Sequence, residues 1–129
     1  MNSIGIIANL TKDGAASVVA ELADWLQKKG VEPLLTEDCA QALESPRTRG
    51  VMSKEELVHK ADSLVVLGGD GTILRVARIP GATNLPILTV NMGSLGFLTE
   101  FKLGELYPAV TSVLEGDFQL DERMMLLAK

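Results

Sequence analysis

Short apolar runs alternate with stretches of helical periodicity along most of this chain. The runs at residues 4–8, 31–36, 64–67 and 86–90 are rich in Ile, Val and Leu. Near-continuous apolar runs of this length are typical of strands buried on both faces rather than strands with one face in solvent. We therefore predict four strands at these positions.

Helices are predicted between these strands. In residues 13–29 the apolar positions recur at steps of three and four, and Gly30 follows a Lys-Lys end. Ser53 and Glu56 have the spacing of a capping box, which predicts a short helix over residues 54–60. Further helices are expected over 73–79 and 105–114. Residues 38–52 contain turn formers and no periodicity, so they are expected to form a mobile surface loop.

The alternation of strands and helices predicts an α/β fold, with an open, mostly parallel sheet that has helices on both faces. The 129 residues, 47% of them hydrophobic, suffice for one ordinary core. We expect one α/β domain over residues 1–117. Residues 118–129 start like a strand and end in an apolar run with nothing after it to pair with. They are expected to be the start of a second domain of a longer protein.

Charge and composition exclude several classes of function. A formal net charge of −5 leaves no basic surface to bind nucleic acid or anionic lipid. No segment approaches the roughly 20 consecutive apolar residues of a membrane span, and no basic residue precedes the first apolar run as in an export signal. Cys39 is the single cysteine. We expect it to be a bystander thiol in a reducing cytoplasm, neither paired nor bound to metal.

Candidate chemistry begins directly after the third predicted strand, at Gly68-Gly69-Asp70-Gly71-Thr72. In an open α/β sheet, ligands bind at the carboxyl ends of the strands, and a glycine turn that leads into a helix presents free amides to an anion. The motif lacks the Gly-Lys-Ser/Thr of a P-loop and the spacing of the dinucleotide GxGxxG fingerprint. A phosphate-binding turn of another kind is therefore predicted.

The carboxylate of Asp70 requires an explanation in such a turn. When ionised it would repel a nearby phosphate oxygen by roughly 1 to 4 kcal/mol, unless a cation or a hydroxyl lay between them. Two functions fit: a ligand for the Mg²⁺ that accompanies a nucleotide, or an acceptor for the proton of an attacking hydroxyl. A third interpretation needs no ligand, because Asp70 would serve only as the N-cap of the following helix.

A second glycine-rich loop follows the fourth predicted strand, at residues 91–99. Its glycines would let backbone approach a ligand closely. Leu95 and Phe97 could form an apolar wall of the same pocket, or they could be ordinary core residues.

The two loops together resemble the NAD kinase family, whose hallmarks include a GGDGT motif and an NxGxLGFL stretch. The first is present as residues 68–72 and the second as residues 91–98. GGDGT alone is shared with diacylglycerol and sphingosine kinases and, in related form, with phosphofructokinases, so the second stretch narrows the resemblance to NAD kinase. The resemblance covers essentially the whole chain.

This resemblance implies an N-terminal domain with a Rossmann-like or phosphofructokinase-like fold. The implied reaction transfers a phosphoryl group from ATP or polyphosphate, with Mg²⁺, to the 2′-hydroxyl of the adenosine ribose of NAD. Asp70 would accept the proton, and Asp70, Gly71 and Arg75 would contact NAD. Gly69 and Thr72 would serve phosphate, whereas Leu95 and Phe97 would line the adenosine pocket.

The family continues into a β-rich second domain with further substrate contacts, so the 129 residues alone are expected to be inactive. Members of the family form homodimers or homotetramers in the cytoplasm, which is the state this resemblance implies.

Arg75 lies four residues after Gly71, so it shares one helix face with the turn. It could equally be a solvated surface arginine.

Two other interpretations remain open. The chain could be the start of a diacylglycerol or sphingosine kinase, although it lacks a lipid-sized apolar insert. It could also be a non-catalytic nucleotide-binding or phospho-receiver module, since about 100 to 150 residues is typical of one α/β domain. A receiver would need clustered acids after its first strand, where this chain has Asn9.

Overall fold

The computed structural model describes residues 2–43, 50–82, 85–92 and 101–115. Strands and helices alternate through this part of the chain, as the sequence predicts. The strands are β1 (Ser3–Ala8), β2 (Glu32–Thr36), β3 (Val51–Met52), β4 (Ser63–Gly68), β5 (Ile87–Asn91) and β6 (Phe101–Lys102). The helices are α1 (Ala15–Lys28), α2 (Glu37–Gln41), α3 (Lys54–Lys60), α4 (Asp70–Ala77) and α5 (Leu106–Leu114).

The six strands of the described ranges form one sheet in the order β3-β2-β1-β4-β5-β6. All neighbouring strands run parallel. The four long strands coincide with the four predicted apolar runs. The two edge strands of the sheet, β3 and β6, have two residues each. The α/β class with a parallel sheet is therefore confirmed.

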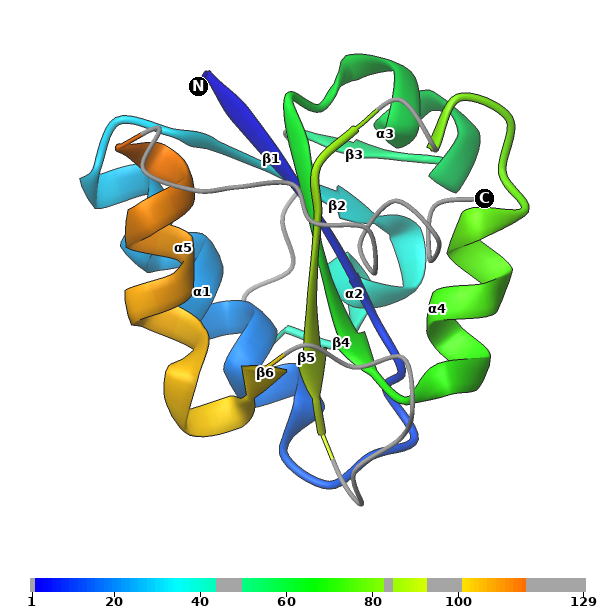
Figure 1. Ribbon diagram of the computed structural model, residues 1–129, viewed down its shortest axis with the longest axis horizontal. Helices are drawn as coiled ribbons and strands as arrows, with labels where there is room; N and C mark the ends of the chain where they lie inside the picture. Colours follow the sequence, from blue (N-terminus) through cyan, green and yellow to red (C-terminus); the bar gives the residue numbers. More distant parts are fainter. Residues whose placement is uncertain (1, 44–49, 83–84, 93–100, 116–129) are drawn as a thin grey trace.

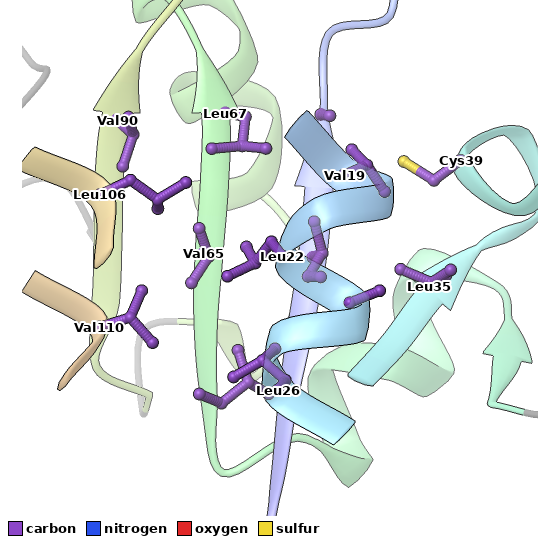
Figure 2. Packing of buried hydrophobic residues seen from close by; sticks show 14 of the residues in the cluster. Val19, Leu22, Leu26, Leu35, Cys39, Val65, Leu67, Val90, Leu106 and Val110 are labelled. Carbon is purple, nitrogen blue, oxygen red and sulfur yellow. The ribbon is translucent and has the colours of Figure 1, made fainter. Parts of the chain in front are cut away.

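Helices cover both faces of this sheet, as Figure 1 shows, with α1 and α5 on one side and α3 and α4 on the other. On the first face, α1 contributes Val19, Leu22 and Leu26 to a cluster that Leu106 and Val110 of α5 complete. Figure 2 shows these side chains directed at strand residues such as Val65 and Val90. Each fully buried Leu or Val contributes about 1.5 to 3 kcal/mol relative to exposure.

A second cluster fills the opposite face. Leu57 and Val58 of α3 and Ile73 and Val76 of α4 pack against strand residues that include Val66. Because consecutive strand residues point to opposite faces, one strand supplies both clusters, with Val65 in the first and Val66 in the second. The continuous apolar runs are thus explained by a sheet covered on both sides.

The predicted loop over residues 38–52 is wrong in part. The five-residue helix α2 begins at Glu37, and the two-residue strand β3 begins at Val51. Residues 44–49 lie outside the described part of the chain. A helix of little more than one turn is too short to produce a recognisable periodicity, and a two-residue strand produces no apolar run.

Cys39 lies in α2 and is fully buried in the first core cluster. Burial raises the pKa of its thiol above the ordinary value, against an opposing contribution from a hydrogen bond with the Thr36 side chain. Thr36 also donates its hydroxyl to Asp38, the residue before the cysteine. The thiol is therefore part of the packing at the end of β2.

The Ser53 half of the predicted capping box forms at α3. The amide of Glu56 donates to Ser53 Oγ at 3.2 Å, and Ser53 Oγ lies 3.4 Å from Glu56 Oε1. The carboxylate of Glu56 thus contacts the Ser53 hydroxyl.

Candidate functional site

The carboxyl ends of β1, β4 and β5 meet at one edge of the sheet. Gly68, the last residue of β4, pairs in register with Asn91, the last residue of β5. On the other side of β4, the amide of Asn9 donates to the Leu67 carbonyl oxygen at 2.8 Å. The chain passes from β1 to β2 in one direction and from β4 to β5 in the other, so the order reverses between β1 and β4. Ligands of open α/β sheets bind at such a reversal.

Helix α4 leaves this edge directly after β4, and its N-cap position is Gly69. Gly69 is extended, with φ −112° and ψ −166°, and no side chain caps the helix. Asp70 is half-buried and lies inside the first turn. The interpretation of Asp70 as N-cap is therefore wrong. The predicted start of this helix at residue 73 was also too late, because the glycines obscured the first turn.

The two adjacent glycines meet different surroundings. A Cβ on Gly68 would lie 2.7 Å from Thr72 Oγ1, 3.0 Å from Thr72 Cβ and 3.3 Å from Asn9 Cβ. Among the residues that the structure describes, a Cβ on Gly69 would meet no atom within 4 Å. Packing within the protein therefore requires a glycine at position 68, whereas position 69 borders open space.

Two further predicted site residues lie on α4, of which Thr72 is buried and Arg75 is exposed. Thr72 is 8% exposed, and its hydroxyl faces Gly68. Arg75 is exposed, and its Nε donates to the Gly71 carbonyl oxygen at 3.3 Å. The Nη2 atom of Arg75 lies 3.9 Å from the point where a Cβ of Gly71 would be. The guanidinium is thus folded back over the first turn that carries Asp70.

Asn9 and Asn91 also belong to this edge, although neither was predicted as a site residue. Asn9 Oδ1 accepts from the Thr11 amide at 3.1 Å and from Thr11 Oγ1 at 2.6 Å, which forms a tight turn after β1. Asn91 is 6% exposed. The available signal was an asparagine directly after an apolar run, at two strands whose carboxyl ends meet.

The structure brings Gly69, Asp70, Gly71, Thr72 and Arg75 together on one turn and one helix. Leu95 and Phe97, predicted for the same pocket, lie outside the described residues. Within the ranges that the structure describes, no group of three or more His, Cys, Asp or Glu side chains could hold a metal ion. None of the described helices has the length and apolar character needed to cross a bilayer.

Comparison with known proteins finds matches to one family. The family model of the ATP-NAD kinase N-terminal domain matches residues 4–118. A NAD kinase of Geobacter sulfurreducens is 46% identical over 126 residues, which are 98% of this chain and 43% of that protein. A NAD kinase of Citrifermentans bemidjiense is 44% identical over 128 residues, or 99% of this chain and 44% of that protein. The chain thus spans less than half the length of these relatives.

Among solved structures, yeast NADH kinase complexed with NADH is similar in fold. The superposition has a TM-score of 0.75 at 25% sequence identity. It covers 91% of this chain and 39% of that one.

Proposed function

This chain belongs to the ATP-NAD kinase family, and from that premise we propose that the intact protein containing it phosphorylates NAD. The proposed reaction transfers the terminal phosphoryl group of ATP, or of polyphosphate, to the 2′-hydroxyl of the adenosine ribose, giving NADP. Relatives named NAD kinase at 44 to 46% identity support it. The proposal includes Asp70, Gly71 and Arg75 as contacts for NAD, and Gly69 as a contact for phosphate.

One observation carries the proposal most directly: a carboxylate lies on the first turn of a helix whose N-cap borders open space. The first amides of a helix have no partner within the helix, and they carry the positive end of its dipole. With no Cβ at Gly69, an anionic oxygen can approach them. Asp70, on the same turn, is then within reach of a hydroxyl that attacks that anion.

In the proposed reaction the ribose 2′-oxygen attacks the terminal phosphorus of ATP and forms a new P–O bond. The bond from that phosphorus to the bridging oxygen breaks, and ADP leaves with the electron pair. The 2′-hydroxyl proton passes to the Asp70 carboxylate, which can release it to solvent after turnover. Most of the catalysis in phosphoryl transfer comes from positioning and charge stabilisation.

Arg75 supports the same reaction as a source of positive charge. Its guanidinium lies over Gly71 and is exposed, so its N–H groups can turn toward a phosphate or a ribose oxygen. The helix dipole and this side chain together offset the repulsion between Asp70 and phosphate.

We propose Mg²⁺ as the companion of ATP rather than as a resident metal of this domain. The described residues contain no cluster of three or more acidic, His or Cys side chains. Mg²⁺ usually keeps several waters and is held by one or two carboxylates plus substrate phosphates. Because Asp70 accepts the proton in this proposal, no residue of this turn is assigned as a metal ligand, and bound Mg²⁺ would neutralise charge on the donor phosphates.

The family resemblance also supports a cytoplasmic homo-oligomer, a dimer or a tetramer, whose partners are small nucleotides. The net charge of −5 argues against nucleic acid and anionic lipid as partners. Leu95 and Phe97 as lining of the adenosine pocket, and a domain boundary near residue 117, stay predictions.

The substitution Asp70→Asn in the intact protein tests the proposed role of the carboxylate. Asparagine has nearly the same volume but cannot accept the hydroxyl proton, so we expect kcat to fall by about 10²- to 10⁴-fold. The KM for NAD is expected to change much less, because the side chain acts mainly in the transition state. NADP formation, followed with an NADP-specific dehydrogenase, measures both.

Glu55→Gln is the matched control, because Glu55 is an exposed acid in the first turn of another helix, α3. It should leave both constants unchanged. Full activity of Asp70→Asn would contradict the role of the carboxylate. Diacylglycerol and sphingosine serve as alternative acceptors, and ATP consumption that depends on a lipid instead of NAD would contradict the proposed substrate.

A further inference from the structure

The Thr72 side chain packs closely against the protein, which binding of a phosphate by its hydroxyl would not require. Its side chain is 8% exposed, and its Oγ1 is the nearest atom to the position that a Gly68 Cβ would occupy, at 2.7 Å. Thr72 Cβ lies 3.0 Å from the same point and Asn9 Cβ 3.3 Å. The side chains of Thr72 and Asn9 therefore both flank the point where a Gly68 Cβ would lie, and no room is left for that Cβ.

The packing around Gly68 brings together three elements at the edge that carries the candidate site. Asn9 follows β1 and is tied to β4 by its amide bond to Leu67 at 2.8 Å. Gly68 ends β4, and Thr72 lies in the first turn of α4. Asp70 lies between Gly68 and Thr72 in the sequence, so the direction of its carboxylate depends on how α4 leaves β4. The branched side chain of Thr72 places two heavy atoms next to its Cβ, so it acts as a spacer at this point.

We propose that Thr72 is a positioning residue, whose shape holds the first turn of α4 against Gly68 and Asn9 and thereby directs the Asp70 carboxylate. The proposal rests on the proposed function, in which Asp70 accepts the proton. It differs from the phosphate contact that the family resemblance implied for Thr72. The hydroxyl faces the end of β4, whereas the open space for a ligand borders Gly69.

Three substitutions in the intact protein separate shape from hydroxyl chemistry. Thr72→Val keeps the branched shape and removes the hydroxyl, Thr72→Ser keeps the hydroxyl and removes the branch, and Thr72→Ala removes both. A displacement of catalytic groups by about 1 Å can lower the rate by up to 10²-fold. We therefore expect kcat to be highest for the valine variant, lower for the serine variant and lowest for the alanine variant. The kcat of the alanine variant should be lower than that of wild type by roughly ten- to a hundredfold. The KM for ATP should change little.

A ligand role for the hydroxyl gives the opposite order. If Thr72→Ser were more active than Thr72→Val, and if the valine variant raised the KM for ATP, the positioning role would be overturned. Equal activity of all three variants would overturn it as well. Thr111→Val is the matched control, since Thr111 Oγ1 donates to the Tyr107 carbonyl oxygen at 2.8 Å on α5, a helix that packs on the opposite face from α4.

Amide hydrogen exchange over residues 68–76 provides a readout that is independent of activity. The amides of this segment should exchange faster in Thr72→Ala than in wild type, whereas those of Thr72→Val should stay close to wild type. Unchanged exchange in the alanine variant would overturn the proposal. If the intact wild-type protein did not phosphorylate NAD, the proposed function would fail, and the exchange measurement would still decide the role of Thr72.

Discussion

At the scale of single residues, Gly68 and Gly69 are adjacent but serve different purposes. Gly68 has no space for a Cβ because Thr72 and Asn9 fill the position, whereas Gly69 has space that nothing in the described structure occupies. Neither glycine has a positive φ. The reason for glycine at position 68 is therefore packing, and under the proposed function the reason at position 69 is access to the helix amides.

Alanine at the two positions should separate these reasons. Gly68→Ala is expected to lower the free energy of unfolding by about 1 to 3 kcal/mol, the usual cost of overpacking. Gly69→Ala should leave that free energy nearly unchanged, since its φ and ψ are open to any residue, but should weaken ATP binding. Urea unfolding and ATP titration of the intact protein measure the two effects. A stable Gly68→Ala variant, or a Gly69→Ala variant with undiminished ATP binding, would contradict this assignment.

At this scale the sequence predicted a glycine turn that leads from a strand into a helix, and β4 and α4 confirm that passage. The sequence could not tell which glycine contacts protein and which borders open space. That distinction depends on Asn9 of β1, which is 59 positions before Gly68 in the sequence. The family resemblance implied a phosphate contact for Thr72, and the sequence could not show the neighbours of its side chain, because they are set by the packing of three elements.

At the scale of elements, Asp62 fastens the beginning of β1 to the turn between α3 and β4. Its carboxylate Oδ2 accepts from the amides of Asn2 at 2.7 Å and Ser3 at 3.1 Å. Ser3 Oγ also donates to the Lys60 carbonyl oxygen at 3.1 Å. The two amide hydrogen bonds lower the pKa of Asp62 below its ordinary value.

The depressed pKa of Asp62 predicts a pH dependence of stability. Its contribution is fully present above the unfolded pKa of about 3.9 and is lost as the pH falls through the lower folded value. We expect wild type to be more thermostable than Asp62→Asn at pH 7, with the difference disappearing at acidic pH. Because the carboxylate is exposed, the difference should be small. Thermal unfolding of both proteins between pH 7 and pH 2 measures it, and a difference independent of pH would contradict the expectation.

Element prediction succeeded where a pattern had the length to be visible. The helix α1 extends over 14 residues and α5 over nine, and both were found to within a few positions. The helix α2 was missed because five residues make little more than one turn. Its position depends on Cys39 and Ala40, which are buried by contacts with distant elements.

At the scale of the whole molecule, the sheet separates two apolar clusters, one on each face. The sequence predicted the parallel sheet and its helices, since buried strands alternating with helices permit few other arrangements. It did not predict the strand order, because β2 and β4 both pair with β1 and no local pattern distinguishes the two sides.

A substitution on one face should destabilise the other, because the same strands supply both clusters. Leu57 of α3 is fully buried in the second cluster, and Trp25 of α1 packs against the first. Leu57→Ala should lower the free energy of unfolding by roughly 2 to 5 kcal/mol. Trp25 is the single tryptophan, and the centroid of its ring lies 5.2 Å from the ring centroid of Tyr107 on α5.

Fluorescence of Trp25 and far-UV circular dichroism, recorded during urea unfolding, test this expectation. Both midpoints should shift together, as they do in a cooperative domain. The surface substitution Leu74→Ala is the control, since Leu74 is 47% exposed on α4 and should shift neither midpoint noticeably. A Trp25 transition that ignored Leu57→Ala would show that the two faces unfold independently.

The direct passage of β4 into α4 has a consequence for how proteins of this family diversify. Strand, turn and helix form one continuous piece, so the Asp70 carboxylate and the first amides of α4 keep a fixed relation to each other. The segment that follows β1 borders the same edge but lies outside this piece, and it is anchored by the Asn9 amide, which donates to the Leu67 carbonyl oxygen. Under the proposed function, we expect natural variation in phosphoryl donor or in the redox state of the acceptor to concentrate in this segment, where a lineage can change its preference without displacing the chemistry.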